Sequence, residues 1–191
     1  MHLPNVSLVA VTSLHFPETE HAIAESKKGI EYGEELYLTD RNLNSSDEYS
    51  HYILYKLAND VKKDFALVIQ YDGYVLHPDA WSDEFFEYDY IGAPWPPNTH
   101  FTKEGQEVRV GNGGFSFRSK KLLNALNDLN LPFTDNGTGF FHEDGVICNY
   151  HRKALEDYGI KFAPVKVAAK FSRELKVPET VEYTFGFHRY A

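Results

Sequence analysis

The chain is poor in cysteine, in secretion and membrane signals and in basic charge, and each shortage excludes a class of protein. Its 191 residues include a single cysteine, Cys148, which cannot form an intrachain disulfide. One unpaired thiol is typical of a reducing compartment. No apolar run reaches membrane-spanning length, and the N-terminus lacks the charged region and long apolar stretch of a secretion signal. We therefore expect a cytoplasmic protein without a transmembrane segment.

The charge balance and the aromatic content narrow the choice of ligand. The chain has 19 lysine and arginine residues against 28 aspartate and glutamate residues, which gives a formal net charge of −9. Binding to nucleic acid needs a clustered basic surface, so this balance argues against a nucleic acid partner. Aromatic residues make up 15% of the chain, which excludes a disordered polypeptide. Such a surface suits uncharged polar ligands such as sugars, or a ligand whose phosphates are carried by a metal ion.

The first half of the chain alternates between strand and helix patterns. Strands are predicted over Val6–Val11, over residues 35–39 and over Phe65–Ile69. Helices are predicted from Pro17 to about Lys28 and over Glu48–Val61. The unbroken apolar run Phe65–Ile69 is typical of a central strand covered on both faces. This order implies right-handed βαβ units, and so a Rossmann-like nucleotide-binding half in an open α/β sheet.

The second half is predicted to be less regular. The pattern indicates a short strand within Val110–Arg118, helices over Ser119–Leu129 and Asp144–Tyr158, and a strand over Lys161–Val167. No repeat or linker divides the chain. We therefore predict one domain, residues 1–191, with a nucleotide-binding half to about residue 76 and an acceptor and catalytic half from about residue 77.

Asp72 is the first candidate for chemistry. It follows the predicted strand Phe65–Ile69, at the end where ligands of open α/β sheets bind. A carboxylate there can hold Mg²⁺ or Mn²⁺, which prefer hard oxygen ligands and in turn neutralise a diphosphate. Asp72-Gly73 between VIQY and YVL is equally the signal of a type I′ hairpin turn. Spacing alone leaves both interpretations open.

Three further segments also have a structural and a functional interpretation. Gly111–Gly114 lets the backbone approach a ligand closely, although a structural bulge explains its glycines equally well. His142–Gly145 stands at a predicted helix start, where Asp144 is either a helix cap or a general base for a bound hydroxyl. His188 is either an ordinary histidine or a metal ligand, and no Cys/His spacing suits zinc.

These segments, in their order along the chain, resemble one family. The pieces are Gln70-x-Asp72, the DYIGAPW string of residues 89–95, the VGNGGFSFRS string of residues 110–119, Glu143-Asp144 and a late Gly-Phe-His. They resemble an uncharacterised family of glycosyltransferase-like domains, found in larger sugar-polymer enzymes and as single domains. The resemblance covers most of the chain from about Phe65 onward, and the first strands more loosely. It implies a single GT-A-like, Rossmann-like open mixed sheet flanked by helices, a UDP-sugar or other nucleotide-sugar donor, and Mn²⁺ or Mg²⁺.

The resemblance also implies roles for the acids and the late histidine. Asp72 matches the metal-binding acid of the D-x-D motif, but the motif is degenerate because its first position is Gln70. His188 matches a histidine that contacts the metal or the diphosphate. Asp144 matches the base that deprotonates the acceptor hydroxyl, which implies inversion at the anomeric carbon. Glu143 would orient the acceptor or support that base.

The remaining expected contacts surround the donor. The resemblance implies donor or acceptor contacts for Val11, Thr12, Ser13, Asp40, Trp95, Asn112, Gly113 and Gly114. The first three end the first predicted strand, where the nucleoside lies in such enzymes, and Asp40 would reach the base or the ribose. The two glycines would line the donor sugar. Trp95 would stack on sugar or acceptor, because aromatic faces make C–H contacts with pyranoses.

The leading hypothesis is thus a metal-dependent, inverting glycosyltransferase that acts on a carbohydrate or glycolipid acceptor in polysaccharide or glycoconjugate synthesis. An inert nucleotide- or sugar-binding module of the same fold is the alternative, favoured by Gln70 and by the small size of the chain. A metal-dependent hydrolase using Asp72, His77, Asp144 and His188 ranks last, because two-metal hydrolases need more clustered ligands.

Overall fold

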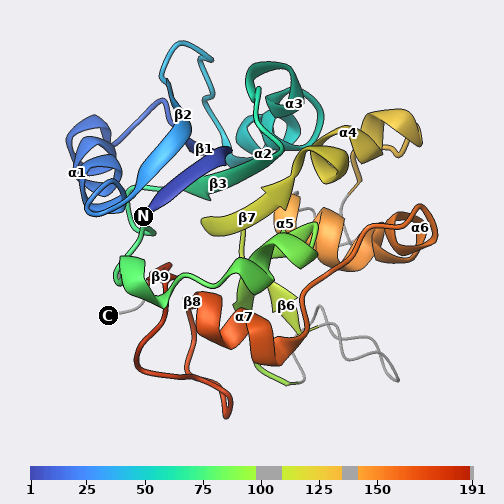
Figure 1. Cartoon of the computed structure of the whole chain (residues 1–191). Helices are drawn as coiled ribbons and strands as arrows, with labels where there is room; N and C mark the ends of the chain where they lie inside the picture. The colour runs from blue at the N-terminus through green and yellow to red at the C-terminus, as the bar shows by residue number, and fades with distance from the viewer. Residues whose placement is uncertain (98–108, 135–141, 190–191) are drawn as a thin grey trace.

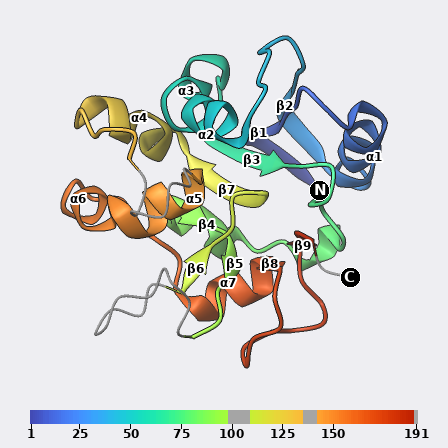
Figure 2. The ribbon, with the colours of Figure 1, turned by 180° about the vertical axis from the view of Figure 1, so that it is seen from behind.

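A five-stranded mixed sheet forms the centre of the computed structural model, which describes residues 1–97, 109–134 and 142–189. The strand order is β2-β1-β3-β7-β4 (Figure 1; β4 is labelled in Figure 2). The strands are β1 (His2–Val11), β2 (Glu31–Leu38), β3 (Phe65–Ile69), β4 (Tyr90–Ile91) and β7 (Phe115–Ser119). β1 is parallel to β2 and β3, whereas β7 is antiparallel to β3 and β4. The predicted open mixed sheet is confirmed, and both halves of the chain contribute strands to it.

Helical crossovers connect the parallel strands of the first half. The helices are α1 (Phe16–Ser26), α2 (Ser46–Tyr55) and α3 (Leu57–Asp60). Ser45 begins α2, because its side chain accepts a hydrogen bond from the backbone N–H of Glu48. The single helix predicted over Glu48–Val61 is two helices, divided at Lys56, whose backbone angles (φ −120°, ψ −31°) leave the helical range.

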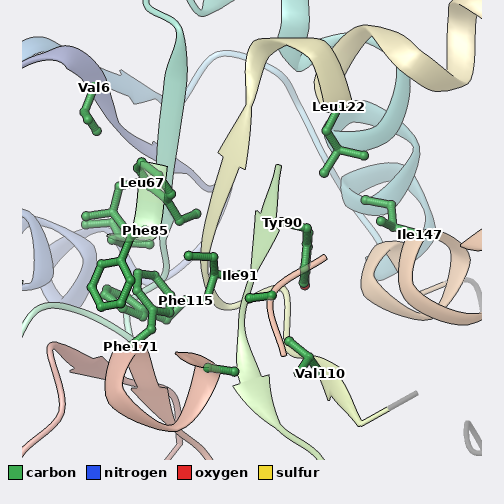
Figure 3. Packing of buried hydrophobic residues seen from close by; sticks show 14 of the residues in the cluster. Val6, Leu67, Phe85, Tyr90, Ile91, Val110, Phe115, Leu122, Ile147 and Phe171 are labelled. Atoms are coloured by element: carbon green, nitrogen blue, oxygen red, sulfur yellow. The ribbon is translucent and has the colours of Figure 1, made fainter. Parts of the chain in front are cut away.

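Alternate residues of β1 and β3 face two different hydrophobic clusters. Leu8 and Leu67 belong to the cluster that includes Ala22 of α1 and much of the second half of the chain (Figure 3). Their neighbours Val9 and Val68 belong to the cluster beneath α2 and α3. α1 and the α2–α3 pair therefore cover opposite faces (Figure 2). β3 is buried on both faces, as its unbroken apolar run predicts.

The second half adds short elements around the far edge of the sheet. They are two 3₁₀ turns (Pro78–Ala80 and Asp83–Glu87), β5 (Ala93–Pro94), β6 (Val110–Gly111), α4 (Lys120–Asp128), α5 (Glu143–Gly145), a π-helical turn (Val146–Tyr150), α6 (Arg152–Asp157), α7 (Val165–Phe171), β8 (Ser172–Arg173) and β9 (Gly186–Phe187). The strand predicted within Val110–Arg118 is split in two by residues 112–114. Within the described residues, no helix has the length and hydropathy needed to cross a bilayer.

The strand predicted over Lys161–Val167 is wrong. Phe162 forms only an isolated bridge with Tyr90, and the chain enters α7 directly after Pro164. Proline suits a helix start, because the backbone N–H groups of the first turn have no partner inside the helix. The apolar residues of this segment are therefore the buried face of a short helix; Phe171 at its end stacks on Phe115 with ring centroids 5.0 Å apart (Figure 3).

Candidate active site

Two adjoining cavities form a cleft at the carboxyl ends of β1 and β3. The β1-side cavity, about 450 Å³, lies between the turn after β1 and the start of α2. The α5-side cavity, about 400 Å³, lies between the glycine segment after β6, the start of α5 and the last described residues. Four residues line both cavities: Ser46, Tyr49, Gln70 and Arg189. The cavities are thus two parts of one cleft, at the sheet edge where open α/β folds bind ligands.

Most of the predicted site residues line this cleft. Val11, Thr12 and Ser13 line the β1-side cavity. The predicted residues that line the α5-side cavity are Trp95, Asn112, Gly113, Gly114, Glu143, Asp144 and His188. Asp40 and Asp72 line neither cavity: the Asp72 side chain lies behind His188 and Arg189, whereas that of Asp40 is 76% exposed and pairs with Arg41. The residues that follow Asp40, which are Arg41, Asn42 and Leu43, line a separate cavity, so the contact of Asp40 with the base or ribose stays a prediction.

Asp72 occupies a tight turn directly after β3. The backbone N–H of Gln70 donates to the carbonyl of Gly73 at 3.0 Å, and the reverse hydrogen bond measures 3.1 Å. Tyr71 and Asp72 are thus the central residues, and neither has a positive φ. A type I′ turn requires positive φ at both central positions, so the I′ interpretation is wrong, although the turn itself is real. The turn directs Asp72 toward the C-terminal segment.

Two cationic side chains of the C-terminal segment hold the Asp72 carboxylate. Arg189 Nε donates to Asp72 Oδ2 at 3.0 Å, and His188 Nε2 lies 3.4 Å from Asp72 Oδ1. Burial opposes ionisation, but His188 and Arg189 outweigh it and lower the pKa of Asp72 to about 2. Burial likewise lowers the pKa of His188, but the carboxylates of Asp72 and Glu174 outweigh burial and raise it to about 9.

Once His188 has released its Nε2 proton to solvent, the Asp72–His188 pair fits one end of a divalent metal site. Asp72 Oδ1 and His188 Nε2 are both buried and both lack a hydrogen-bond partner. Glu174 Oε1 holds the other ring nitrogen of His188 at 3.0 Å, as carboxylates commonly do behind metal-binding histidines. Because Asp72 and Glu174 face opposite ring nitrogens of His188, the three side chains do not converge on one metal position. In the described part of the chain, no group of three or more His, Cys, Asp or Glu side chains is suited to a metal ion.

The glycines of the VGNGG string make room for functional side chains. A Cβ on Gly113 would lie 1.8 Å from Glu143 Oε1, and one on Gly114 would lie 2.2 Å from His188 Nε2. A Cβ on Gly111 would likewise overlap the Trp95 ring, at 1.8 Å. From the sequence, we expected a ligand to approach the backbone closely at these glycines. In the structure, the protein's own side chains Glu143, His188 and Trp95 occupy that space.

Gly114→Ala is therefore expected to displace the His188 imidazole from Asp72. Crowding of this kind costs about 1–3 kcal/mol of stability. Any Mn²⁺-dependent nucleotide binding should weaken as well, which calorimetric titration measures. Gly159→Ala is the matched control, because its φ of 94° makes alanine strained at a position that lines neither cavity. Equal nucleotide affinity in the Gly114 variant and the wild type would contradict the role given to His188.

A buried ion pair fixes Glu143 at the floor of the α5-side cavity. Arg118, in β7, is fully buried, and its Nη2 donates to Glu143 Oε1 at 2.6 Å. Arg118 Nε also donates to Ser116 Oγ at 2.9 Å, and the guanidinium lies over the Tyr90 ring. Burial raises the pKa of Glu143, and the charge of Arg118 opposes the rise. The Glu143 carboxylate is thus held in an ion pair with Arg118.

Asp144, next along the chain, is half-buried and belongs to none of the ion pairs found among the described residues. Its Oδ1 accepts a hydrogen bond from the backbone N–H of Gly145 at 2.8 Å. The residue at the N-cap position of α5 is His142, and its side chain makes no capping hydrogen bond. The interpretation of Asp144 as a helix cap is therefore wrong, and among the described carboxylates that line this cavity Asp144 is the one without a cationic partner.

Four further residues hold or line the site and were not predicted from the sequence: Tyr49, Arg118, Glu174 and Arg189. Arg118 carries the clearest signal, because an arginine inside the buried pattern FSFRS requires a buried anionic partner. Tyr49 accepts a hydrogen bond from the Gln70 side-chain amide at 3.0 Å, which explains how Gln70 is used here. Glu174 and Arg189 lie in an irregular segment, where no periodic pattern indicates their contacts.

Two solved glycosyltransferases are similar in fold to this chain. One is the glycosyltransferase involved in glycosylation of the major capsid of the virus PBCV-1, with a TM-score of 0.58, 15% identity, and coverage of 96% of this chain and 92% of that chain. Another is a mutant of Drosophila β1,4-galactosyltransferase 7 in complex with manganese, UDP-Gal and xylobiose, with a TM-score of 0.52, 10% identity, and coverage of 97% and 71%. The fold is therefore glycosyltransferase-like.

A family model identifies the chain more narrowly. Residues 34–188 match the family described as Protein of unknown function (DUF5672), and the chain belongs to that family. No curated protein matches the sequence. The family description names no activity, so the function rests on the cleft and its chemistry.

Proposed function

We propose that this chain is a glycosyltransferase that moves a sugar from a nucleotide-sugar donor to a hydroxyl group of a carbohydrate acceptor. One observation carries the proposal: Asp144, His188 and the turn after β1 all line a single cleft at the strand ends, and Asp72 lies directly behind His188, 3.4 Å from its Nε2. In this proposal Asp144 serves the acceptor, the Asp72–His188 pair serves the diphosphate, and the turn after β1 serves the nucleoside. UDP is the first nucleotide to test, because UDP-Gal is bound in the Drosophila galactosyltransferase complex.

The donor would lie along the whole cleft. Val11, Thr12 and Ser13 would contact the nucleoside in the β1-side cavity, and the diphosphate would lie where the two cavities meet. The donor sugar would then enter the α5-side cavity, beside Gly113 and Gly114. This direction follows from the resemblance to GT-A-type glycosyltransferases, which implies that the nucleoside lies at the end of the first strand.

Asp72 and His188 would hold a divalent cation through Oδ1 and Nε2, both of which are buried and make no hydrogen bond within the described residues. Mg²⁺ and Mn²⁺ prefer oxygen ligands and keep sites for phosphate and water, so two protein ligands suffice when the donor supplies the rest. Such a cation would neutralise charge on the leaving diphosphate. Manganese in the Drosophila complex supports the choice of metal.

Asp144 would act as the general base. It would accept the proton of the acceptor hydroxyl while that oxygen attacks the anomeric carbon, and the bond between this carbon and the diphosphate oxygen would break. The electron pair of the broken bond would leave with the diphosphate. A single displacement of this kind inverts the anomeric configuration. Glu143 is unsuited to the role because its charge is neutralised by Arg118.

Calorimetric titration with UDP, GDP, CMP and dTDP, each with and without Mn²⁺, tests the donor site. We expect tight binding of one nucleotide with Mn²⁺ and weakening by about tenfold or more in Asp72→Ala, equivalent to about 1.4 kcal/mol. The control is Asp157→Ala, which removes an exposed carboxylate paired with Lys153. Failure of a folded protein to bind any of the four nucleotides would refute the proposed function.

The hydrolase alternative lacks a suitable ligand cluster. His77, which it requires, stacks on Tyr183 with ring centroids 4.0 Å apart, whereas Asp72 and His188 pair with each other. Among the described residues, no metal-binding group of three or more His, Cys, Asp or Glu side chains supports it either. The inert binding module remains the competing proposal, because Gln70 replaces an acid of the metal motif.

A further inference from the structure

Arg189 stands where the two parts of the cleft meet. Of the four residues that line both cavities, Ser46, Tyr49, Gln70 and Arg189, it is the one that carries a charge. Its backbone N–H donates to the carbonyl oxygen of Asp72 at 2.9 Å, and its Nε donates to Asp72 Oδ2. The backbone φ of 52° lies in the left-handed region. The main chain of Arg189 is thus fixed to the turn that follows β3.

The side chain of Arg189 remains accessible although its main chain is fixed. It is 66% exposed, whereas the side chain of Asp72 behind it is 20% exposed. The guanidinium is always charged and offers five N–H donors, of which the Asp72 contact described here uses one. A ligand at the junction of the two cavities would therefore meet an arginine with further donors, anchored at one end by a carboxylate.

The charge of the surrounding cleft makes this cation important for an anionic ligand. Glu143 and Glu174 in the α5-side cavity are paired with Arg118 and His188, but Asp144 has no cationic partner among the described residues, and the whole chain has a formal net charge of −9. A diphosphate entering this cleft would be repelled unless cationic groups stood at its binding position. Arginine suits phosphate oxygens because its planar fork can donate two parallel hydrogen bonds.

We propose that Arg189 binds the diphosphate of the nucleotide directly, through guanidinium N–H groups that Asp72 leaves unused. This inference rests on the proposed function and adds to it a diphosphate contact made by the protein itself. The contact does not depend on a divalent cation, so part of the diphosphate affinity persists when metal is removed. During transfer the same contact stabilises the charge that the leaving diphosphate gains as its bond to the anomeric carbon breaks.

The test compares ligands with and without the diphosphate. UDP, uridine and inorganic pyrophosphate are titrated calorimetrically, in EDTA and in Mn²⁺, into the wild type, Arg189→Ala and Arg189→Lys. Loss of a hydrogen bond to a charged group costs UDP and pyrophosphate about 10- to 100-fold in affinity, whereas uridine affinity stays unchanged. Lysine, which keeps the charge but not the fork, gives an intermediate loss. The control Lys153→Ala removes an exposed cation that lines neither cavity.

Three results would overturn the inference. Equal UDP affinity in Arg189→Ala and the wild type, in both EDTA and Mn²⁺, would remove Arg189 from the diphosphate site. Equal losses for UDP and uridine, with an unchanged thermal midpoint, would assign Arg189 to the nucleoside instead. Diphosphate affinity that vanishes entirely in EDTA would leave the metal as the sole diphosphate contact. If the folded wild type binds none of the four nucleotides tested above, the proposed function itself fails, and that outcome is distinct from these three.

Discussion

Asp144→Asn is expected to abolish sugar transfer while leaving the donor bound. An amide cannot accept the acceptor proton, and removal of a general base typically slows turnover about 10²- to 10⁴-fold. Asparagine has nearly the same shape as aspartate and can still accept the hydrogen bond from Gly145 N–H, so the fold and the cavity should persist. Turnover is measured as nucleotide release with acceptor, and donor affinity by calorimetry.

The matched control for this variant is Asp157→Asn. The same acid-to-amide change occurs there at a 66% exposed side chain on α6 that lines neither cavity. We expect turnover to match that of the wild type. If Asp144→Asn retained more than about a tenth of wild-type turnover, the base would have to be another group, because a general base contributes about 10²-fold or more.

Arg118→Met is expected to cause the largest loss of stability among the substitutions considered. It leaves Glu143 buried without its cation, and breaking one side of a buried pair costs about 3–5 kcal/mol. For a domain of this size each kcal/mol lowers the thermal midpoint by about 2–4 °C, so the expected loss is on the order of 10 °C. Thermal unfolding followed by circular dichroism measures it.

The pH dependence of that loss follows from Glu143. Burial raises the pKa of Glu143 above its usual value, and removing Arg118 raises it further. The folded variant then holds a proton that the unfolded chain releases, so its stability falls as pH rises above about 4.5. The deficit relative to wild type should be smallest below that pH and grow above it. A deficit that is constant across pH 4–8 would mean that lost packing, and not the charge of Glu143, causes it.

The double variant Arg118→Met with Glu143→Gln separates charge from packing. Replacing both charged partners leaves no unpaired buried ion, so most of the lost stability should return. If the double variant is as unstable as Arg118→Met alone, the pair is held together by shape and not by charge. Either result leaves Asp144 intact and allows turnover to be compared.

The sequence predicted the parts of the fold that depend on local pattern. The unbroken apolar run of β3 and the alternation of strand and helix in the first half need only neighbouring residues to be recognised. The segment after Lys161 was misjudged because its apolar residues suit a strand or a short buried helix equally well. The segment forms a helix because Pro164 stands at its N-cap, and proline favours the start of a helix.

The candidate site residues that belong to short sequence motifs were predicted, whereas their partners from distant parts of the chain were not. Asp72, Glu143, Asp144 and His188 belong to short recognisable strings. The partner of Glu143, in contrast, lies 25 residues away in β7, and that of Asp72 lies 117 residues away at Arg189. Such pairings depend on how the strands and the C-terminal segment pack, and no local pattern encodes them.

The same distinction explains the glycines. From sequence, residues 113 and 114 suggest a ligand approaching the backbone. The fold instead uses their missing Cβ atoms to admit Glu143 and His188, two side chains that line the cavity. The VGNGG string therefore contributes to the site indirectly, by letting the Glu143 carboxylate and the His188 imidazole lie against the backbone just before β7.

Acceptor-stimulated nucleotide release distinguishes a glycosyltransferase from an inert nucleotide-binding module of the same fold. The wild type would be incubated with the UDP-sugars, Mn²⁺ and a panel of carbohydrate acceptors, with Asp144→Asn beside it, and products analysed by mass spectrometry and by NMR at the anomeric carbon. For a transferase with Asp144 as its base, we expect one acceptor to accelerate release and yield a glycoside of inverted configuration, and the variant to form none. Tight UDP binding without product from any donor and acceptor pair would contradict the transferase and leave an inert nucleotide-binding module.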